Sequence, residues 1–422
     1  MRAVVVALGK IGLPIAAKIA LAGHDVVGCD ADPRVVELVN RAVEPFPGEA
    51  GLQDALAELV PSGRLHARGD TTAAVAEGAD LVVAVPPLLV DAQARPDYRI
   101  LDSVIADIGR GLTAGTVVSV ETTVPVGTIR DRLAPALAEL SGLRPEEDFF
   151  LVHSPERVYS GRIFQDLETY PKLVGGLSPE GERRAVELYR SFLGAEVWSM
   201  GSAEAAELTK LAETTYRDVN IALANEFARF ADRLGIDIQP VIDAANSQPY
   251  SHIHRPGIAV GGHCIPVYPR FYLAGDPEAR LPATSREVND RMPAYAVELL
   301  AAELGAALDS ARVLILGVTY RGGVKETAFS GAFPVAQELA HRGATALASD
   351  PLYDEAELRL LGFEPWDGEP IDAAVVQADH SAYARLTPGD LPGVRVIVDG
   401  RGILDAAAWR AAGVTVRRIG RP

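Results

Sequence analysis

The sequence predicts an α/β protein in which two Rossmann-like, doubly wound parallel-sheet domains are joined by a long central helix. Two observations predict it. Short, almost wholly apolar runs alternate with helical patterns at both ends of the chain, and one unbroken helical pattern lies between them. Strands that are apolar on both faces are typical of a parallel sheet covered by helices on each side. We place the domains at 1–200, 201–304 and 305–422.

The N-terminal domain begins with a β-branched apolar run and continues in strict alternation. Segments such as 101–112 have the apolar spacing of helices. Strands are expected at 2–8, 25–30, 79–86 and 115–123, with a further strand, "DFFLV", just before Ser154.

Residues 202–235 contain no proline and, before the final Gly235, no glycine, and their apolar residues recur at helical spacing. Ser202 is placed to cap the N-terminus of this helix. A helix of about 30 residues is roughly 45 Å long at 1.5 Å per residue. Helices of this length connect domains or form dimers, so we expect both roles here.

A second alternating region follows the helical centre and predicts the C-terminal α/β domain. Its strand-like runs are "ARVLILGVTYRGG", "ALASDPLY", "AAVVQAD" and "RVIVDGRGIL". The two α/β ends are compatible with a remote duplication, which the sequence does not decide.

Bulk composition narrows the classes of partner. A chain of 422 residues is too long for a single ordinary core. Its formal charge of −17 argues against nucleic acid and anionic membrane, and no segment reaches the roughly 18 apolar residues of a membrane span. Two cysteines make neither a disulfide framework nor a zinc site, so no metal is expected. The N-terminus lacks a secretory pattern, and we expect a cytoplasmic protein.

The turn "ALGKIG" after the first strand predicts a dinucleotide site. It fits G-x-G-x-x-G with Ala7 at the first glycine; Gly9 would admit a pyrophosphate and Gly12 would let the helix pack on the strand. Asp30, at the end of the second strand, suits a ribose diol and repels a 2′-phosphate, which favours NAD over NADP. The alternative is a flavodoxin-like unit that binds no dinucleotide. The expected cofactor-binding residues are Gly9, Lys10, Ile11, Gly12, Asp30, Arg34, Pro86 and Thr123.

The second constellation is "GGHCIP", which holds one of the two cysteines. Gly261 and Gly262 would let the backbone approach a ligand closely, and a thiolate at Cys264 would be a nucleophile toward an aldehyde. The alternative is a buried structural cysteine, which is how we interpret Cys29 in its apolar strand.

Two further charged groups carry both a chemical and a structural interpretation. Lys210 shares one face of the long helix with Thr214 and Arg217, which is equally the pattern of a solvated helix face. Glu156, in a loop after a buried strand, suits general acid/base work but also an N-cap.

Taken together, these segments resemble the nucleotide-sugar 6-dehydrogenases, the UDP-glucose/UDP-N-acetylmannosamine dehydrogenase family. The resemblance extends over nearly the whole chain, and "SPERV" and "GGHCIP" are closer to its N-acetylhexosamine branch. The motifs that carry it are "ALGKIGLP", "ETTVPVGT", "SPERV", "ELTKLAETTYRDVNIALANE", "AVGGHCIPVYP" and "DGRGIL".

The resemblance implies oxidation of a sugar C6 alcohol in two steps with two NAD, through a cysteine thiohemiacetal and thioester, to a uronate. It implies that Cys264 is the nucleophile, that Lys210 steadies oxyanions and that Glu156 moves protons. Thr123 and Thr214 complete the expected catalytic set. The long helix itself predicts a homodimer that forms through it. The expected residues for the nucleotide-sugar substrate are Glu156, Arg157, Lys210, Arg255, Gly261, Gly262, Tyr320, Arg321 and Arg401.

Several positions depart from the family pattern. Thr214 replaces an asparagine, Tyr268 replaces an aspartate four residues after the cysteine, and Tyr250 replaces an arginine that reaches the neighbouring subunit. Two motifs also differ, "VPPL" at 85–88 and "KETAFS" at 325–330. These departures leave two alternatives open: an enzyme that stops after one oxidation, at an aldehyde or ketone, and a non-catalytic protein that binds a nucleotide sugar or NAD.

Overall fold

The computed structural model describes residues 1–159 and 161–421, which fold into two compact units. The first unit contains Met1–Glu213 and Arg270–Asp276, and the second contains Thr214–Pro269 and Pro277–Pro422. The boundaries fall inside helices α9 (Ala203–Leu234) and α11 (Tyr268–Gly275), so each of these helices contributes residues to both units. The three domains placed from the sequence remain a prediction.

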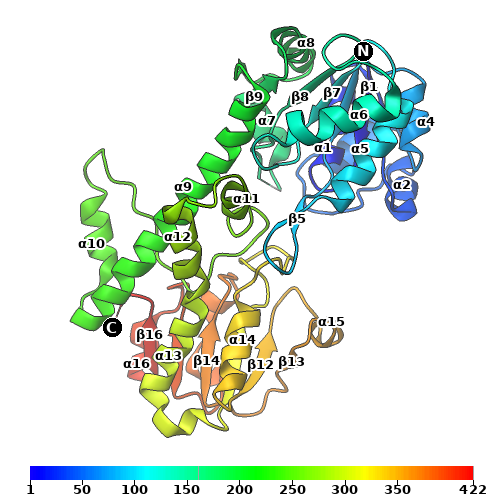
Figure 1. The fold of residues 1–422 in the computed structure, drawn as a ribbon. Coiled ribbons are helices and arrows are strands. Elements are labelled where there is room, and N and C mark those ends of the chain that lie inside the picture. The colour runs from blue at the N-terminus through cyan, green and yellow to red at the C-terminus, as the bar shows by residue number, and fades with distance from the viewer. Residues whose placement is uncertain (160, 422) are drawn as a thin grey trace. The chain divides into compact units, whose positions relative to one another are not determined.

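The first unit is built on an eight-stranded sheet (Figure 1). Six of its strands follow the order 3-2-1-4-5-6 when numbered along the chain, which is the order of the dinucleotide-binding fold. In spatial order the strands are β10 (Val197–Ser199), β9 (Lys172–Gly176), β8 (Phe150–His153), β7 (Val117–Val120), β4 (Leu81–Ala84), β1 (Arg2–Val6), β2 (Asp25–Cys29) and β3 (Leu65–Arg68).

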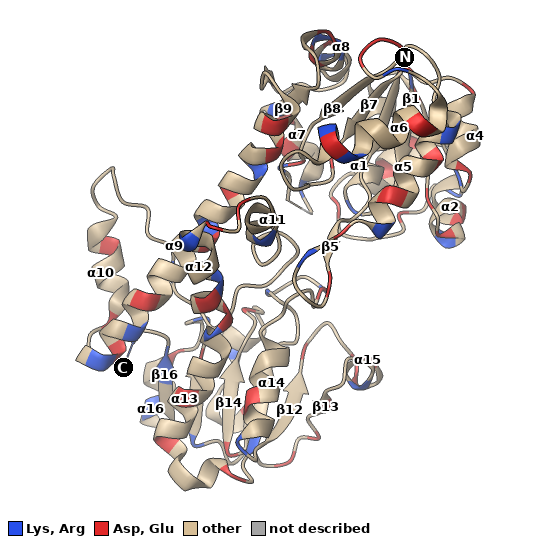
Figure 2. Ribbon diagram, viewed as in Figure 1, with Lys and Arg blue, Asp and Glu red and all other residues tan. Residues whose placement is uncertain are grey.

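Helices cover both faces of this sheet, as the apolar strands require. Helices α4, α5 and α6 pack side by side, while α1 and α3 pack together and bury apolar residues in the main core of this unit. Strands β4 and β7, in the middle of the sheet, carry no charged residue, as β7 shows in Figure 2. The helices are α1 (Gly12–Leu21), α2 (Pro33–Asn40), α3 (Leu52–Leu59), α4 (Thr71–Ala76), α5 (Arg99–Gly111), α6 (Ala134–Ser141), α7 (Ile163–Thr169) and α8 (Pro179–Arg190).

Three local elements complete this unit. The strands β5 (Leu89–Val90) and β6 (Pro96–Asp97) form a small ribbon, and a π-helical turn at Thr128–Leu133 precedes α6. Strand β9 runs antiparallel to β8, which the sequence did not predict. This reversal pairs the end of β9 with the end of β8, so that the beginning of β9 runs alongside the loop with Glu156.

The second unit has a six-stranded, fully parallel sheet with the same 3-2-1-4-5-6 order. Its strands in space are β13 (Glu364–Pro365), β12 (Thr345–Ser349), β11 (Arg312–Leu316), β14 (Ala373–Val376), β15 (Val396–Asp399) and β16 (Thr415–Arg418). Its helices are α10 (Ile238–Ala245), α12 (Arg280–Asp290), α13 (Met292–Leu304), α14 (Ala332–His341), α15 (Glu355–Leu360) and α16 (Ala406–Ala411), with short 3₁₀ turns at 305–308, 383–385 and 388–390.

Two cores lie on opposite faces of this second sheet. Helices α13 and α14 bury Val297 and Val335 on one face, and α16 buries Trp409 on the other. The prediction of two doubly wound units is therefore confirmed, and their common strand order supports the idea of a duplication.

The long central helix α9 spans 32 residues, as its sequence predicts. The Ser202 hydroxyl accepts a hydrogen bond from the Ala205 N–H at 3.1 Å, which confirms the expected N-cap. Among the described residues, no helix has a stretch long and apolar enough to cross a lipid bilayer.

Candidate active site

Five of the predicted residues of the first unit lie just beyond the carboxyl ends of adjacent parallel strands. Gly9 follows β1, Asp30 follows β2, Pro86 follows β4, Thr123 follows β7 and Glu156 follows β8. Ligands of doubly wound sheets bind at this edge. The fold thus gathers at one edge residues that are far apart in the sequence.

The turn after β1 has the geometry of a dinucleotide-binding turn. Ala7 has a φ of 74°, the left-handed conformation that the first glycine of the motif usually supplies. A Cβ on Gly12 would lie 1.9 Å from the Ala7 carbonyl oxygen, so helix α1 can approach β1 only with glycine there. A Cβ on Gly9 would meet no described atom within 4 Å, so packing within the chain does not explain Gly9, whereas close approach of a pyrophosphate does.

Asp30 accepts hydrogen bonds from the backbone in addition to its expected role in binding the ribose diol. Its Oδ2 accepts a hydrogen bond from the Leu8 N–H at 2.7 Å, and its Oδ1 accepts one from the Asp32 N–H at 2.8 Å. Each carboxylate oxygen has more than one lone pair, so a ribose diol can still bind. The acid therefore links the end of β2 to the glycine turn. It thereby fixes the two parts of the predicted NAD site relative to each other.

The other predicted cofactor residues divide into exposed and buried ones. Lys10 is exposed and Ile11 is half-buried, whereas Arg34 is exposed and forms an ion pair with Asp32. Pro86 is buried and its carbonyl accepts a hydrogen bond from the Thr122 hydroxyl at 2.5 Å. Thr123, the next residue, is 6% exposed. The residues present fit a dinucleotide, and these assignments stay predictions.

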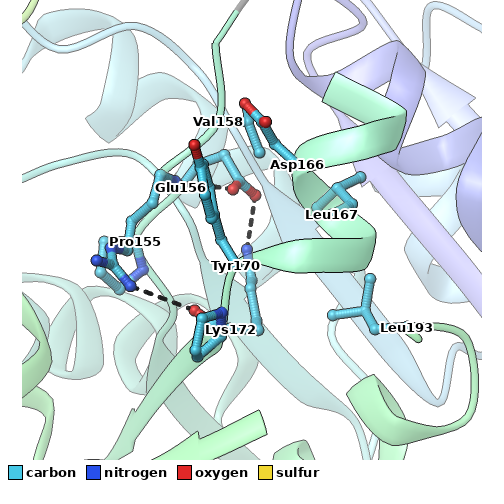
Figure 3. Close-up of a pocket in the computed structure, with 10 residues that line it drawn as sticks. Pro155, Glu156, Val158, Asp166, Leu167, Tyr170, Lys172 and Leu193 are labelled. Carbon is cyan, nitrogen blue, oxygen red and sulfur yellow. Dashed lines mark hydrogen bonds and ion pairs between the residues drawn. The ribbon is translucent and has the colours of Figure 1, made fainter. Parts of the chain in front are cut away.

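Glu156 does not cap a helix, since α7 begins only at Ile163 and is preceded by Arg162. Its carboxylate instead lies 2.7 Å from the ammonium of Lys172, as the dashed line in Figure 3 shows, and its Oε1 accepts the Arg157 N–H at 2.8 Å. The Lys172 ammonium also lies 2.8 Å from Glu121. Neither Lys172 nor Glu121 is among the site residues predicted from the sequence.

The position of β9 explains how Lys172 reaches Glu156. Val152 pairs with Gly176 and His153 with Gly175, and continuing this antiparallel register brings Glu156 opposite Lys172. A charged residue opening an apolar run, "KLVGG", was the available signal. Lys172 can be recognised as a partner of Glu156 only when β9 is known to run antiparallel to β8.

This buried cluster determines the protonation of its members. Burial raises the pKa of Glu121 to about 7, although Lys172 lies next to it. Burial would also raise the pKa of Glu156, but the Lys172 charge and hydrogen bonds from its neighbours hold it below its ordinary value. Burial likewise lowers the pKa of Lys172, and this is outweighed by the two carboxylates, which raise it. Glu156 is therefore the carboxylate that stays ionised, as a proton acceptor must be.

Arg157 lies beside this cluster, in a pocket that residues of the same loop line together with residues of α7, Lys172 of β9 and Leu193. Its guanidinium pairs with Glu213 at 3.2 Å and donates to the Pro171 carbonyl at 3.4 Å. Lys210 and Thr214 are 9% and 3% exposed. The alternative of a solvated helix face is therefore wrong for these two residues.

The loop with Cys264 lies wholly in the second unit and is braced by its C-terminal sheet. The Gly262 N–H donates to the Ala328 carbonyl at 2.8 Å. A Cβ on Gly261 would lie 2.6 Å from the Cβ of Tyr320, and Gly262 has a φ of 90°. Packing against Tyr320 thus requires these glycines, and the close approach of a ligand to them stays a prediction.

Cys264 itself is exposed, whereas Cys29 is completely buried in β2. Burial raises the pKa of the Cys29 thiol to about 11, which makes it unreactive. The alternative of a buried structural cysteine therefore holds for Cys29 and is wrong for Cys264.

The predicted arginines of the second unit differ in what their side chains contact. Arg401 donates to the Gln377 carbonyl at 2.6 Å and to the Tyr320 carbonyl at 2.9 Å. These hydrogen bonds link two loops at the carboxyl edge of the sheet. Arg321 donates to the Tyr320 hydroxyl at 3.0 Å. Arg255 is exposed. Their expected roles with a nucleotide sugar remain predictions.

The fold and these residues define an NAD-type dehydrogenase with an accessible cysteine thiol. Three family models describe the chain further: the NAD-binding domain of the UDP-glucose/GDP-mannose dehydrogenase family matches residues 1–193, its central domain 204–291 and its UDP-binding domain 314–406. The chain belongs to this family, and it is an NAD-dependent nucleotide-sugar dehydrogenase, as the resemblance implied.

Individual relatives agree over the full length. A UDP-N-acetyl-D-mannosamine dehydrogenase of Pyrococcus horikoshii is 34% identical over 100% of this chain and 99% of its own. The solved structure titled as UDP-D-ManNAc dehydrogenase from Pyrococcus horikoshii is 33% identical and superposes with a TM-score of 0.90 over 100% and 99% of the two chains. An NDP-N-acetyl-D-galactosaminuronic acid dehydrogenase of Ralstonia solanacearum is 31% identical over 95% of this chain and 96% of its own.

Proposed function

We propose that the protein oxidises the C6 alcohol of a UDP-N-acetylhexosamine to the uronate, with UDP-N-acetylmannosamine as the first substrate to test. Full-length similarity to dehydrogenases named for N-acetylated sugars supports the N-acetylhexosamine over the hexose. The family's UDP-binding domain model over 314–406 supports the nucleotide.

The cofactor would be held by the turn after β1 and by the acid after β2. Gly9 would admit the pyrophosphate to the N-terminus of α1, which Gly12 lets pack on β1, and Asp30 would accept hydrogen bonds from the adenosine ribose. When bound there, NAD accepts a hydride from the sugar carbon at each oxidation. The chain's own residues transfer the protons and supply the nucleophile.

The chain moves the protons and forms the covalent bond. In the first oxidation the C6 carbon loses a hydride and its hydroxyl loses a proton, which Glu156 is ionised to accept. The Cys264 thiol then adds to the aldehyde carbon, and its proton passes to the carbonyl oxygen. This thiohemiacetal loses its hydroxyl proton to Glu156, which has released the first proton to water, and a second hydride, which leaves a thioester. Water attacks the thioester, the carbon–sulfur bond breaks, and the carboxylate leaves with the thiol restored. Lys210 stabilises the oxyanions.

The observation that carries this proposal is the contrast between the two thiols. The chain keeps one cysteine buried and inert and presents the other on a loop that is braced by Gly262 and Tyr320. Holding the nucleophile in a fixed loop reduces the entropy that must be lost on reaching the bond-forming geometry.

We further propose a cytoplasmic homodimer. On α9 the side chains of Leu223, Phe227, Phe230 and Leu234 are 37–55% exposed and recur every three or four residues. An exposed apolar stripe of this spacing is suited to pack against a second copy of itself.

Incubation with NAD and a panel of UDP- and GDP-sugars tests the function. The expected result is two NADH for each UDP-N-acetylmannosamine and a product that mass spectrometry identifies as the uronate. Cys264→Ser should form no acid. The absence of sugar-dependent NADH across the panel would reject the enzyme and favour the non-catalytic binding protein.

A second candidate function is a single oxidation to the aldehyde or ketone, and two residues favour it. Thr214 is buried where the family has an asparagine, and Tyr268 opens α11 where the family has an aspartate. One NADH per sugar and no acid would support this candidate. In that case Tyr268→Asp combined with Thr214→Asn should restore the second oxidation.

A further inference from the structure

The cluster of Glu121, Lys172 and Glu156 has one more acid than base and is largely buried. The side chains of Lys172, Glu121 and Glu156 are 5%, 0% and 11% exposed. One ammonium lies within hydrogen-bond distance of both carboxyl groups. If both were ionised, the buried cluster would carry a net negative charge, which the low-dielectric interior disfavours.

The two carboxyl groups differ in their surroundings. Glu121 follows β7, and its Oε1 accepts a hydrogen bond from the Tyr189 hydroxyl, which is also 2.8 Å from the Ser119 hydroxyl. Glu156 lies in a loop at the edge of the sheet, and its carboxylate accepts the Arg157 N–H at 2.8 Å. Glu156 is thus the carboxyl group that opens toward the candidate site, and Glu121 is the one enclosed behind it.

The remaining titratable groups around Glu121 do not supply a second charge to balance it. Tyr189 is buried, and burial raises the pKa of its hydroxyl well above the ordinary value, so it stays neutral. His153 in β8 is completely buried, and burial lowers its pKa to about 3, so it is neutral too. Arg157 is already paired with Glu213 at 3.2 Å. Among the described residues around Glu121, the positive charge that balances the cluster therefore comes from Lys172.

We propose that Lys172 and Glu121 are positioning residues for Glu156: Lys172 holds the Glu156 carboxylate ionised and in place, and Glu121 keeps the single proton that the two buried carboxyl groups retain. This inference rests on the proposed role of Glu156 in proton transfer. Glu121 itself makes no contact with the reacting atoms in this assignment; it sets the charge of the pair and so the basicity of Glu156.

The proton assignment is tested without turnover, by infrared difference spectroscopy of the full-length protein. Wild type should show the C=O stretch of one protonated buried carboxyl group, and this band should disappear as the pH is raised through about 7, the pKa of Glu121. Glu121→Gln should lack the band, whereas in Glu156→Gln the band should remain but titrate at a lower pH than in wild type, because Lys172 then pairs with Glu121 alone. A wild-type spectrum without the band, or a band that survives in Glu121→Gln, would overturn the assignment.

The positioning role is tested by the pH dependence of kcat. Lys172→Met should move the acidic limb to higher pH by about 1–3 units, because a neighbouring cation lowers a carboxyl pKa by that much. Lys172→Arg should keep the limb near its wild-type position. Glu121→Gln should remove an inflection near pH 7 and leave the acidic limb in place. If Lys172→Met does not fold, Glu121→Gln still decides, since an unchanged inflection overturns the proposal.

Glu156→Gln separates this inference from the function on which it rests. If this variant keeps wild-type kcat, the proposed role of Glu156 is wrong. If Glu156→Gln loses activity while the pH profiles of Glu121→Gln and of a folded Lys172→Met match wild type, the role of Glu156 stands and the positioning inference is wrong. Thermal unfolding of each variant shows which of them are folded well enough to be compared.

Discussion

The backbone N–H of Leu8 donates a 2.7 Å hydrogen bond to the carboxylate of Asp30. Leu8 belongs to the glycine turn after β1 and Asp30 ends β2, so one contact joins the two parts of the predicted NAD site. The second unit repeats it: the Val318 N–H, after β11, donates to Asp350, after β12, at 2.8 Å. Asp350 also contacts Thr319 and His380 and is only 5% exposed, so the repeated acid is enclosed.

Asp30→Asn should weaken NAD binding and relax the preference for NAD over NADP. The change removes the charge that binds the ribose diol and repels a 2′-phosphate, while one amide oxygen remains for the Leu8 N–H. Hydrogen bonds to a charged group contribute about 1.5–3 kcal/mol, so KM for NAD should rise roughly tenfold to a hundredfold. Steady-state kinetics with both cofactors measures this. If the ratio of kcat/KM with NAD to kcat/KM with NADP is unchanged, Asp30 only stabilises the turn.

Gly12→Ala should lower the stability of the fold, whereas Gly9→Ala should lower the affinity for NAD. A Cβ at Gly12 collides with the Ala7 backbone, so the helix must shift, and overpacking of this kind costs about 1–3 kcal/mol. Gly9→Ala meets no described atom and should keep the wild-type Tm but lose NAD affinity. Differential scanning calorimetry and NAD titration distinguish them. Equal Tm values for both variants would contradict the packing argument.

The two thiols should react at very different rates. With the protein in its native state, a thiol-specific chromogenic reagent should modify one cysteine per chain quickly, since Cys264 is exposed and Cys29 is buried. Denaturation should make the second cysteine accessible to the reagent. Cys264→Ser should abolish the fast phase, and Cys29→Ser is the matched control that should keep it. A fast phase of two thiols in native protein would contradict the burial of Cys29.

Much of the fold follows from local patterns, and the site follows only in part. Alternating apolar runs and the glycine turn locate the strands at which Gly9 and Glu156 lie. The pairing of Glu156 with Lys172 depends on a strand that reverses its direction, which no local pattern records. The reason for Gly261 is likewise non-local, because Tyr320 lies some sixty positions further along the chain. Contacts between distant segments have no short-range signature.

Glu207 should make stability depend on pH. It accepts the Gly127 and Ile129 N–H groups at 2.7 and 2.9 Å, and burial raises its pKa to about 7. A carboxyl group whose pKa is higher when folded stabilises the fold at low pH, and this contribution is lost as the pH rises through about 7.

The neutral variant Glu207→Gln lacks this titration. Its Tm relative to wild type should therefore increase from about pH 5 to pH 7 and then stay constant. Thermal unfolding in matched buffers measures the difference. A difference that does not change with pH would show that Glu207 is ionised throughout this range.

The exposed stripe on α9 should control the oligomeric state. Introducing charges with Leu223→Glu and Phe230→Glu places two carboxylates in the proposed interface, where they would lose hydration without gaining a partner, so a dimer should dissociate to a monomer. Size-exclusion chromatography with light scattering at micromolar concentration gives the mass. Leu360→Glu is the matched control, because Leu360 on α15 is 88% exposed and lies outside the stripe. Since its side chain is already in water, this control should leave the mass unchanged. A wild-type protein that is already monomeric would refute the dimer, and dissociation by the control would show that added charge alone, rather than the stripe, is responsible.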